Sequence, residues 1–431
     1  MKTIIDLHMH SHYSRATSKQ LTPFGIVRAA ALKGVDVIAT GDITHPQWLD
    51  EIERDCIEDG SGFLTLKPEV IERNWKAEDP YWMREAMTRV RLILFGEVSN
   101  IYRRDDKTRR VHMLFGVSSL AAARAVNTEL QDRGYNILYD GRPIIGMDVR
   151  ELMKMYLDVD PNALVIPAHI WTPWFALFGS KSGFDSLEEC FGDMTPHIFA
   201  IETGLSSDPA MNVRVSSLNN VLITSHSDAH STEKVGREAT VMELPERTYT
   251  ALHTAMKNRE GPLCTIEFYP EEGKYHMDGH RACNVRLTPK ETLKNNGLCP
   301  VCKLPVVVGV MNRVEQIADQ TADERPKNVS APFQSIVPLP EIIASAFGVK
   351  SVTSKRVQAE FMSLIHALGN EFFILLDAPI KDIARVAHPL VAEGVKRVRE
   401  GTIHIEPGYD GAFGVVEVFT QDERAQYKQR S

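Results

Sequence analysis

Several features that would place the chain in a special class are missing from the sequence. It has no apolar run of the length that a membrane-spanning helix needs, and no basic region followed by an apolar stretch at its N-terminus. It contains neither internal repeats nor low-complexity tracts. We therefore expect a globular, cytoplasmic protein without a membrane anchor. Of the residues, 43% are hydrophobic and 25% charged, which is typical of a globular protein. A chain of 431 residues is too long for one ordinary hydrophobic core and suggests two or three domains.

A positive net charge is also missing, and cysteine is scarce. The formal net charge of −8 argues against a general electrostatic attraction to nucleic acid, although it says nothing about local basic patches. The six cysteines of a cytoplasmic chain are better explained as metal ligands or buried thiols than as disulfides. We expect Cys56 and Cys190 to be ordinary buried thiols.

Short apolar runs alternate with helical patterns in the first half of the chain. This alternation predicts an α/β fold built from βα units around a parallel sheet. The expected strands lie within residues 3–10, 34–42, 91–99, 109–117, 163–171, 197–204 and 220–230. Each run ends in or near side chains that can bind a metal: His8, His10, Asp42, Glu97, His112, His169, Glu202, Asp228 and His230.

The positions of these side chains favour a shared metal site. Residues i and i+2 of a strand face the same side, so His8 and His10 point at one spot. In a closed βα barrel, the C-terminal ends of the strands converge on one rim that carries the chemistry. The alternative is a set of unrelated strand-end histidines that tolerate solvent, but such residues would not keep this register.

The number and type of these ligands predict more than one ion. Mixed imidazole and carboxylate ligands suit catalytic transition-metal ions better than a calcium cage. We expect two or three divalent ions, Zn²⁺, Mn²⁺ or Mg²⁺. Closely spaced ions suit the hydrolysis of phosphate esters, because they supply hydroxide and stabilise the charge on phosphorus and on the leaving oxygen.

A second metal site is predicted from cysteine spacing. Cys264, Cys283, Cys299 and Cys302 are separated by eighteen, fifteen and two residues, and four thiolates can close a tetrahedral structural zinc site. The flanking segments are polar, so the zinc would contribute folding energy. A redox Cys-x-x-Cys is the alternative, and His276 and His280 are candidate substitute ligands.

The motifs resemble a known superfamily. His8-Met9-His10, Asp42 in "TGD", Glu97, His112 in "VHML", His169 in "PAHIW" and Asp228 to His230 in "SDAH" resemble the PHP (polymerase and histidinol phosphatase) superfamily. The resemblance implies a distorted seven-stranded (β/α) barrel. It further implies one ion on His8, His10, Glu97 and Asp228, a second on Glu97, His112 and His169, and a third on Asp42 and His230.

A narrower resemblance covers nearly the whole chain. The segments "HSHYSRATSK", "TGDITHPQW", "FGSKSGFDSLEECFGD", "ETGLSSDP" and "SHSDAHS", followed by the four cysteines, are similar to the endonuclease Q family. This resemblance implies a DNA repair endonuclease that cuts 5′ to deaminated bases (uracil, hypoxanthine, xanthine) or abasic sites. Catalysis would then depend on Asp228, Glu97, His8 and His10. Damaged DNA would be the partner, with a sliding clamp as a candidate protein partner.

Such an enzyme must read a base taken out of the stack, which needs apolar walls and hydrogen-bond donors. The loop after His169 offers both, and its candidate substrate-binding residues are Trp171, Trp174, Phe175, Phe178, Ser180, Ser182 and Gly183. The alternative is that the aromatic residues fill the mouth of the barrel. The basic segment 102–110 is a candidate for DNA backbone contact, or else an exposed hairpin tip.

We expect three domains. Residues 1–245 would form the catalytic barrel, 246–325 the zinc-binding domain, and 326–431 a helical C-terminal domain. Its basic residues Lys396, Arg397 and Arg399 are a candidate DNA contact, or else a solvated face with favourable cations at the end of a helix.

Three other functions stay open. A phosphatase of a small phosphomonoester would use the same ligands but needs no cysteine segment. An amidohydrolase-type deaminase fits poorly with Glu97 and the Asp228-x-His230 pair. A nucleic-acid-binding repair scaffold would make its contacts through the cysteine module.

Overall fold

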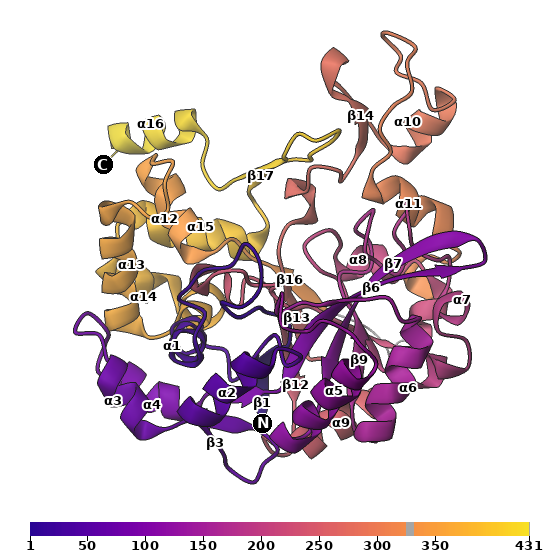
Figure 1. Cartoon of the computed structure of the whole chain (residues 1–431). Coiled ribbons are helices and arrows are strands. Elements are labelled where there is room, and N and C mark those ends of the chain that lie inside the picture. The colour runs from indigo at the N-terminus through magenta and orange to yellow at the C-terminus, as the bar shows by residue number, and fades with distance from the viewer. Residues whose placement is uncertain (325–331, 431) are drawn as a thin grey trace. The chain divides into compact units, whose positions relative to one another are not determined.

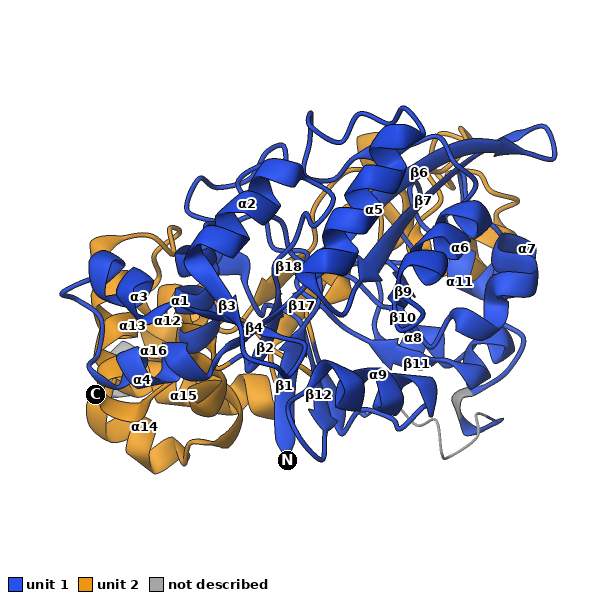
Figure 2. Ribbon diagram, turned by 60° about the horizontal axis from the view of Figure 1, so that its bottom comes forward, with its two compact units in different colours: residues 1–31, 35–266, 313–333 blue, residues 32–34, 267–312, 334–431 orange. Residues whose placement is uncertain are grey.

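The computed structural model describes residues 1–324 and 332–430 (Figure 1). It divides into two compact units, coloured separately in Figure 2. Unit 1 comprises residues 1–31, 35–266 and 313–333, and unit 2 comprises residues 32–34, 267–312 and 334–431. None of the helices among the described residues is long and apolar enough to cross a membrane.

The elements up to residue 267 alternate strands with helices. The strands are β1 (Lys2–Asp6), β2 (Val37–Ala39), β3 (Cys56–Glu58), β4 (Leu64–Leu66), β5 (Arg91–Ile93), β6 (Phe95–Arg104), β7 (Lys107–Gly116), β8 (Ile144–Ile145), β9 (Leu164–Pro167), β10 (Ala200–Glu202), β11 (Leu222–Thr224), β12 (Ala239–Glu243) and β13 (Cys264–Glu267). The helices are α1 (Pro23–Lys33), α2 (Pro46–Asp55), α3 (Pro68–Asn74), α4 (Trp82–Arg89), α5 (Leu120–Asp132), α6 (Val149–Val159), α7 (Leu187–Phe191), α8 (Pro209–Asn212) and α9 (Tyr249–Lys257).

The later elements are mainly helical. The strands are β14 (Asp278–His280), β15 (Val285–Leu287), β16 (Phe333–Ser335), β17 (His404–Glu406) and β18 (Val415–Glu417). The helices are α10 (Pro289–Lys294), α11 (Val310–Ile317), α12 (Leu339–Phe347), α13 (Lys355–Leu368), α14 (Ile380–Val386), α15 (Pro389–Glu400) and α16 (Gln421–Arg430).

The strands of unit 1 form separate sheets. The largest contains β13-β12-β1-β2-β5-β4-β3 in that order, the second β8-β6-β7-β9, and the third the parallel pair β10-β11. The predicted parallel pairing holds for β1-β2-β5, whereas β12 pairs with β1 in antiparallel fashion. Each of the seven predicted runs contains a strand, but a count of seven strands in one closed barrel is not confirmed.

The hairpin of β6 and β7 departs from the predicted βα pattern. The two strands are antiparallel, with Arg104 paired to Lys107 and only Asp105 and Asp106 between them. Both aspartates have positive φ, 52° and 57°, which is the backbone of the tight two-residue turns that close hairpins. The basic segment 102–110 is therefore a hairpin tip. The same pairing sets Glu97 opposite Leu114 and Ser99 opposite His112, so two predicted ligands lie on neighbouring strands.

Unit 2 combines a small cysteine-bearing segment with a helical group. In the cysteine-bearing segment, the buried hydrophobic cluster is small: Leu287, Cys299 and Val306. The helical group is better packed, and Gly394 of α15 allows a close approach to α12, since a Cβ there would lie 2.6 Å from Ile342 Cγ2. The units differ from the three predicted ranges, because residues 267–312 group with the C-terminal helices and residues 246–266 with unit 1.

Candidate active site

Two groups of potential metal ligands share one carboxylate in unit 1. His8, His10, Glu97 and Asp228 offer ligand atoms that all lie within 4.8 Å of one another, and so do Glu97, His112 and His169. All six residues were predicted from the ends of strand-like runs. The structure brings them together from β6, β7 and the segments that follow β1, β9 and β11.

The two oxygens of Glu97 face different groups. Oε2 lies 3.6 Å from His8 Nε2 and 3.4 Å from His10 Nε2. Oε1 lies 2.5 Å from His112 Nδ1 and 3.1 Å from His169 Nε2. The geometry suits a carboxylate that bridges two neighbouring cations.

Two further carboxylates orient the histidines of the first group. Glu202 accepts a hydrogen bond from His8 Nδ1 at 2.9 Å, and Asp42 accepts one from His10 Nδ1 at 3.2 Å. Each bond leaves the Nε2 atom free to act as a ligand, as is usual for metal-binding histidines. Glu202 also accepts a bond from the His169 amide at 2.7 Å, so it supports one ligand of each group. The sequence marked Glu202 as a strand-end residue but did not assign it to the site.

Three residues of the site have strained backbones. The φ angles of Asp42, His169 and Asp228 are 49°, 29° and 45°, in the left-handed region that side chains rarely adopt. Such conformations concentrate at functional sites, where the surrounding structure enforces them. Here they turn the chain sharply just after β2, β9 and β11, so that the side chains point toward the shared centre.

The electrostatics of the site favour cations. Burial would lower the pKa of His8, but the surrounding carboxylates, Glu202 first among them, outweigh it and raise that pKa well above its usual value. The pKa of His10 is raised in the same way, by Asp228 and Asp42 against the effect of burial. His112 differs, because burial lowers its pKa to about 4 and keeps it neutral.

The residues fit divalent ions. The buried His8 Nε2 forms no hydrogen bond with any described residue, although it lies 3.4 Å from Asp228 Oδ1. A buried nitrogen without a partner is costly, and a cation between it and the carboxylates would remove that cost. The donor set of imidazoles and carboxylates matches the transition-metal ions expected from the sequence.

The implied third ion finds less support. Asp42 already accepts hydrogen bonds from His10, from the amide and hydroxyl of Ser11, and from Ser14. These bonds fit an orienting role behind His10, and the ligand role of Asp42 stays a prediction. His230 lies beside His10, with ring centroids 4.5 Å apart, but no third ligand group is formed by Asp42 and His230 within residues 1–324 and 332–430.

Arg142 is a residue of the site that sequence reasoning missed. Its Nη1 donates to Glu97 Oε2 at 3.0 Å. The preceding Gly141 lies against Asp42, and a Cβ there would be 2.1 Å from Asp42 Oδ2. Glycine therefore lets this loop approach the centre and deliver the guanidinium. Nothing in the periodicity of the loop sequence marks Arg142, and only a glycine-arginine pair in a polar loop could have suggested it.

The aromatic loop after His169 is split between core and surface. Trp171 and Phe178 are buried, and Trp171 donates to Asn212 Oδ1 at 2.8 Å. Their predicted role as substrate-binding residues is corrected, because core side chains cannot reach a substrate. Trp174 is 45% exposed, and Phe175 packs its ring 4.9 Å from that of His112. Ser180, Ser182 and Gly183 line a cavity beside β7.

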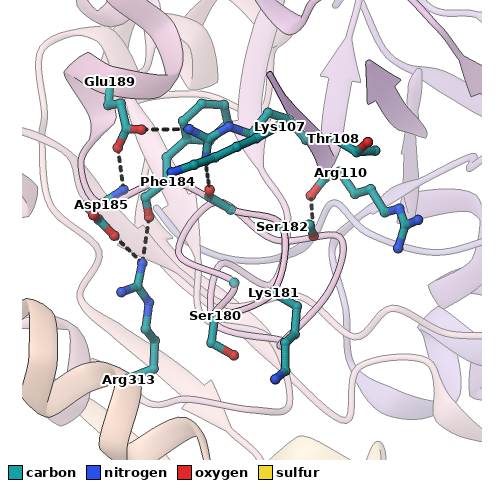
Figure 3. A pocket seen from close by; sticks show the side chains of 13 residues that line it. Lys107, Thr108, Arg110, Ser180, Lys181, Ser182, Phe184, Asp185, Glu189 and Arg313 are labelled. Carbon is teal, nitrogen blue, oxygen red and sulfur yellow. Dashed lines mark hydrogen bonds and ion pairs between the residues drawn. The ribbon is translucent and has the colours of Figure 1, made fainter. Parts of the chain in front are cut away.

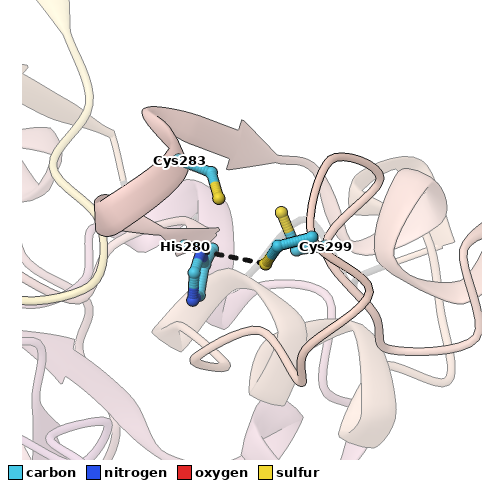
Figure 4. Close-up of side chains that lie close together, drawn as sticks. His280, Cys283 and Cys299 are labelled. Atoms are coloured by element: carbon cyan, nitrogen blue, oxygen red, sulfur yellow. Dashed lines mark hydrogen bonds between the residues drawn. The ribbon is translucent and has the colours of Figure 1, made fainter.

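Unit 2 contains the second candidate metal site. Ligand atoms of Cys283, Cys299 and Cys302 gather with His280, and Cys302 Sγ lies 3.6 Å from His280 Nδ1. Figure 4 shows the side chains of His280, Cys283 and Cys299 close together. The neighbouring thiols, Cys302 first, raise the pKa of Cys283 to about 11. A bound cation would favour the thiolate and so lower this pKa. Three thiolates and one imidazole are a common set for structural zinc.

Cys264 is not part of this cluster. It lies in β13, opposite Val241 of β12 in unit 1, and His280 supplies the fourth ligand position. The predicted four-cysteine set is therefore corrected to three cysteines and a histidine.

Comparisons with known proteins agree with this architecture. Residues 338–402 match a family described as the MJ0043 C-terminal domain. The uncharacterised protein MJ0043 of Methanocaldococcus jannaschii is 32% identical over 293 residues, which are 65% of this chain and 36% of that protein. The chain thus spans about a third of the length of that relative. The uncharacterised protein YqxK of Bacillus subtilis is 27% identical over 96% of this chain and 99% of its own length.

Two solved structures match almost the whole chain. The lesion-specific endonuclease PfuEndoQ from Pyrococcus furiosus aligns with a TM-score of 0.82 and 29% identity over 97% of this chain and 95% of its own. Endonuclease Q in complex with a 27-mer duplex carrying an abasic lesion at the active site aligns with a TM-score of 0.80 and 29% identity, over 98% of both chains. With the ligand groups in place, these matches confirm the resemblance found in the sequence: the chain is similar to endonuclease Q in sequence and in fold along almost its whole length.

Proposed function

We propose that the chain is a metal-dependent DNA repair endonuclease that hydrolyses the phosphodiester on the 5′ side of a deaminated base or an abasic site. One observation carries the proposal. Two ligand groups share Glu97 in a chain that aligns along almost its whole length with a lesion-specific endonuclease. The solved complex of a relative with damaged duplex DNA supports DNA as the partner.

The ligand groups assign roles to individual residues. His8, His10, Glu97 and Asp228 would hold one divalent ion, and Glu97, His112 and His169 a second. Ions so placed supply a nucleophile near neutral pH and stabilise the charge that develops on the phosphate and the leaving oxygen. Glu202 and Asp42 hold the histidine rings in the orientation that exposes their Nε2 atoms.

Arg142 adds a fixed positive charge to the site. Its side chain is partly exposed, and its Nη1 lies on the Oε2 side of Glu97, beside the first ligand group. A guanidinium in this place can donate to a nonbridging oxygen of the scissile phosphate. We therefore assign Arg142 a part in binding and neutralising that phosphate.

Recognition of the lesion is assigned to the loop that follows His169. Trp174 and Phe175 are the accessible aromatic residues of that loop, and Phe175 contacts the ligand His112. Bases stack on exposed aromatic rings with little dependence on sequence. A base taken out of the helix would therefore meet this pair near the metal centre.

The test uses labelled duplexes that carry uracil, hypoxanthine, an abasic site or no lesion, with Mn²⁺ or Mg²⁺ added. We expect a single cut 5′ to each lesion and none in the undamaged duplex. Asp228→Ala should abolish cutting, whereas Asp158→Ala, an exposed aspartate of the same unit, should not. Rapid hydrolysis of an aryl phosphate by a chain that leaves all lesion duplexes intact would overturn the proposal.

A further inference from the structure

A polar cavity of about 530 Å³ lies beside strand β7 in unit 1 (Figure 3). Its lining comes from residues 107–110 of the β6–β7 hairpin, residues 179–185 of the loop after His169, Glu189 and Arg313. Five of the lining side chains are cationic and two are anionic. The cavity therefore belongs to the catalytic unit and carries an excess of positive charge.

The excess is concentrated on three cations without acidic partners. Arg109 pairs with Glu189 at 2.9 Å and Arg313 with Asp185 at 2.5 Å, so two of the five cations are neutralised. The remaining three, Lys107, Arg110 and Lys181, form no ion pair with any residue that the structure describes. In Figure 3, Arg110 and Lys181 extend to the right of the paired group of Asp185, Glu189 and Arg313.

The loop that forms one wall is folded tightly. A Cβ on Gly183 would lie 2.5 Å from the Gly179 amide and the Leu177 carbonyl, so only glycine fits there. The amides of Gly179, Lys181, Gly183 and Phe184 are used within the loop. Those of Ser180 and Ser182 donate to no acceptor among the described residues. Free backbone amides next to unpaired cations are typical of anion sites.

The lining does not suit a base. Phe184 is the one aromatic residue of the lining, and it is buried with the Arg109 guanidinium 4.0 Å from its ring centroid. A base pocket needs an accessible aromatic or apolar face. The positive charge, hydroxyl groups and free amides instead suit a phosphate.

The part of the cavity that Arg110 lines is one strand step from the metal centre. Arg110 and the ligand His112 are two residues apart on β7, so their side chains lie on the same face about 7 Å apart along the strand. Phe175 connects them, with its ring 4.9 Å from that of His112 and 5.8 Å from the Arg110 guanidinium. Successive nucleotides of a DNA strand rise by about 3.4 Å along the helix axis. The separation thus corresponds to one or two nucleotides.

We propose that this cavity binds a backbone phosphate of the cut DNA strand, one or two nucleotides from the scissile bond, and not the extruded base. The inference rests on the proposed nuclease function for its choice of strand. It predicts that the cavity contributes to the affinity for DNA irrespective of the lesion, while the aromatic pair Trp174 and Phe175 contributes only when a lesion is present.

The first experiment compares binding to lesion and undamaged duplexes by fluorescence anisotropy. Arg110→Ala and Lys181→Ala are measured in the cleavage-deficient Asp228→Ala background, with Lys154→Ala as an exposed control from α6. Each cavity variant should lower the affinity for both duplexes equally, on the order of fivefold. It should also lower the magnitude of the slope of log affinity against log salt by about 0.9. The control should change neither quantity.

Two results would overturn the inference. A loss confined to the lesion duplex would assign the cavity to the base, and no loss with either duplex would show that no DNA group occupies it. Lys181 lies on an exposed loop, so Lys181→Ala keeps the test valid if Arg110→Ala disturbs β7. If the unaltered chain cut no lesion, the proposed function would fail, but the binding to undamaged duplex would still decide the role of the cavity.

A second experiment locates the phosphate. Single neutral methylphosphonates are placed in turn along the cut strand, and binding is measured with and without Lys181→Ala. At one position within two nucleotides of the cut, the methylphosphonate should weaken binding of the parent chain and cost nothing further in the variant. Additive losses at every position would contradict the proposal.

Discussion

The two candidate metal sites are built in opposite ways. The imidazole and carboxylate centre of unit 1 lies among buried side chains, and Glu202 and Asp42 hold its histidines from behind. In the cysteine and histidine cluster of unit 2, Cys299 packs in a small buried hydrophobic cluster with Leu287 and Val306, and Cys302 is exposed. The first site is organised by the fold, so ions bound there would serve the chemistry. The second has little else to hold it, so an ion bound there would contribute to folding.

Metal removal should have the largest effect of all the changes, because it should unfold the cysteine-bearing segment of unit 2 and leave unit 1 folded. After treatment with a strong chelator, we expect the amides of β14, β15 and α10 to lose their protection against hydrogen exchange, because structural zinc contributes most of the folding free energy of such modules. The strands of unit 1 should stay protected. Cys299→Ala should reproduce the loss and lower the zinc content by one ion per chain, whereas Cys264→Ser should not. Full protection of β14 and β15 in the metal-free chain would show that the cysteine-bearing segment folds without an ion, as unit 1 is expected to do.

The converse change, in unit 1, should abolish activity without unfolding. Asp228→Ala removes a ligand of the first group, and we expect the rate of lesion cleavage to fall at least about a thousandfold. The melting temperature should change little, because the surrounding core and hydrogen bonds stay in place. Melting curves and cleavage rates measured together would check this. A large loss of stability would mean that the ion also holds unit 1 together.

The two metal sites also differ in how well the sequence predicted them. The strand-end ligands were predictable because a strand alternates sides every residue and because polar residues interrupt otherwise apolar runs. The sequence offered His280 only as a substitute ligand, since cysteine spacing does not reveal that the units divide between Cys264 and His280. The hairpin tip at residues 102–110 was one of two alternatives from the sequence, and the positive φ angles at Asp105 and Asp106 that close it follow no periodic pattern. Arg142 was missed because its role depends on the loop fold.

Substitution of Glu202 tests whether hydrogen bonds from the fold orient the metal ligands of unit 1. It accepts hydrogen bonds from His8 Nδ1 and from the His169 amide, so it is a positioning residue for both ligand groups. Glu202→Ala should lower metal affinity or activity by about 10- to 100-fold. Glu202→Gln should recover part of the loss, since its amide oxygen still accepts one bond. Isothermal titration with Mn²⁺ and cleavage assays would measure both. Equal losses in the two variants would point to charge instead of orientation.

Arg142 should give the smallest effect of the series. Arg142→Lys keeps the charge but loses the planar set of donors, and we expect about a tenfold lower cleavage rate with unchanged metal content. Arg142→Ala should lose more, and added guanidinium should restore part of its activity. Guanidinium rescue would not be seen if the side chain only braced Glu97. Unaltered rates in both variants would exclude a contact with the phosphate.

The absence of a side chain at Gly141 limits how the protein can be re-engineered. Any larger residue there would press on the Asp42 carboxylate, which lies 2.1 Å from the place of a Cβ. The loop cannot be varied evenly, because its last residues are fixed by the catalytic centre. Leu138 and Tyr139, three and two positions earlier, are 57% and 69% exposed and carry no such constraint. A library in this loop that is meant to keep the metal centre intact should therefore vary these two positions and leave residues 140–142 untouched.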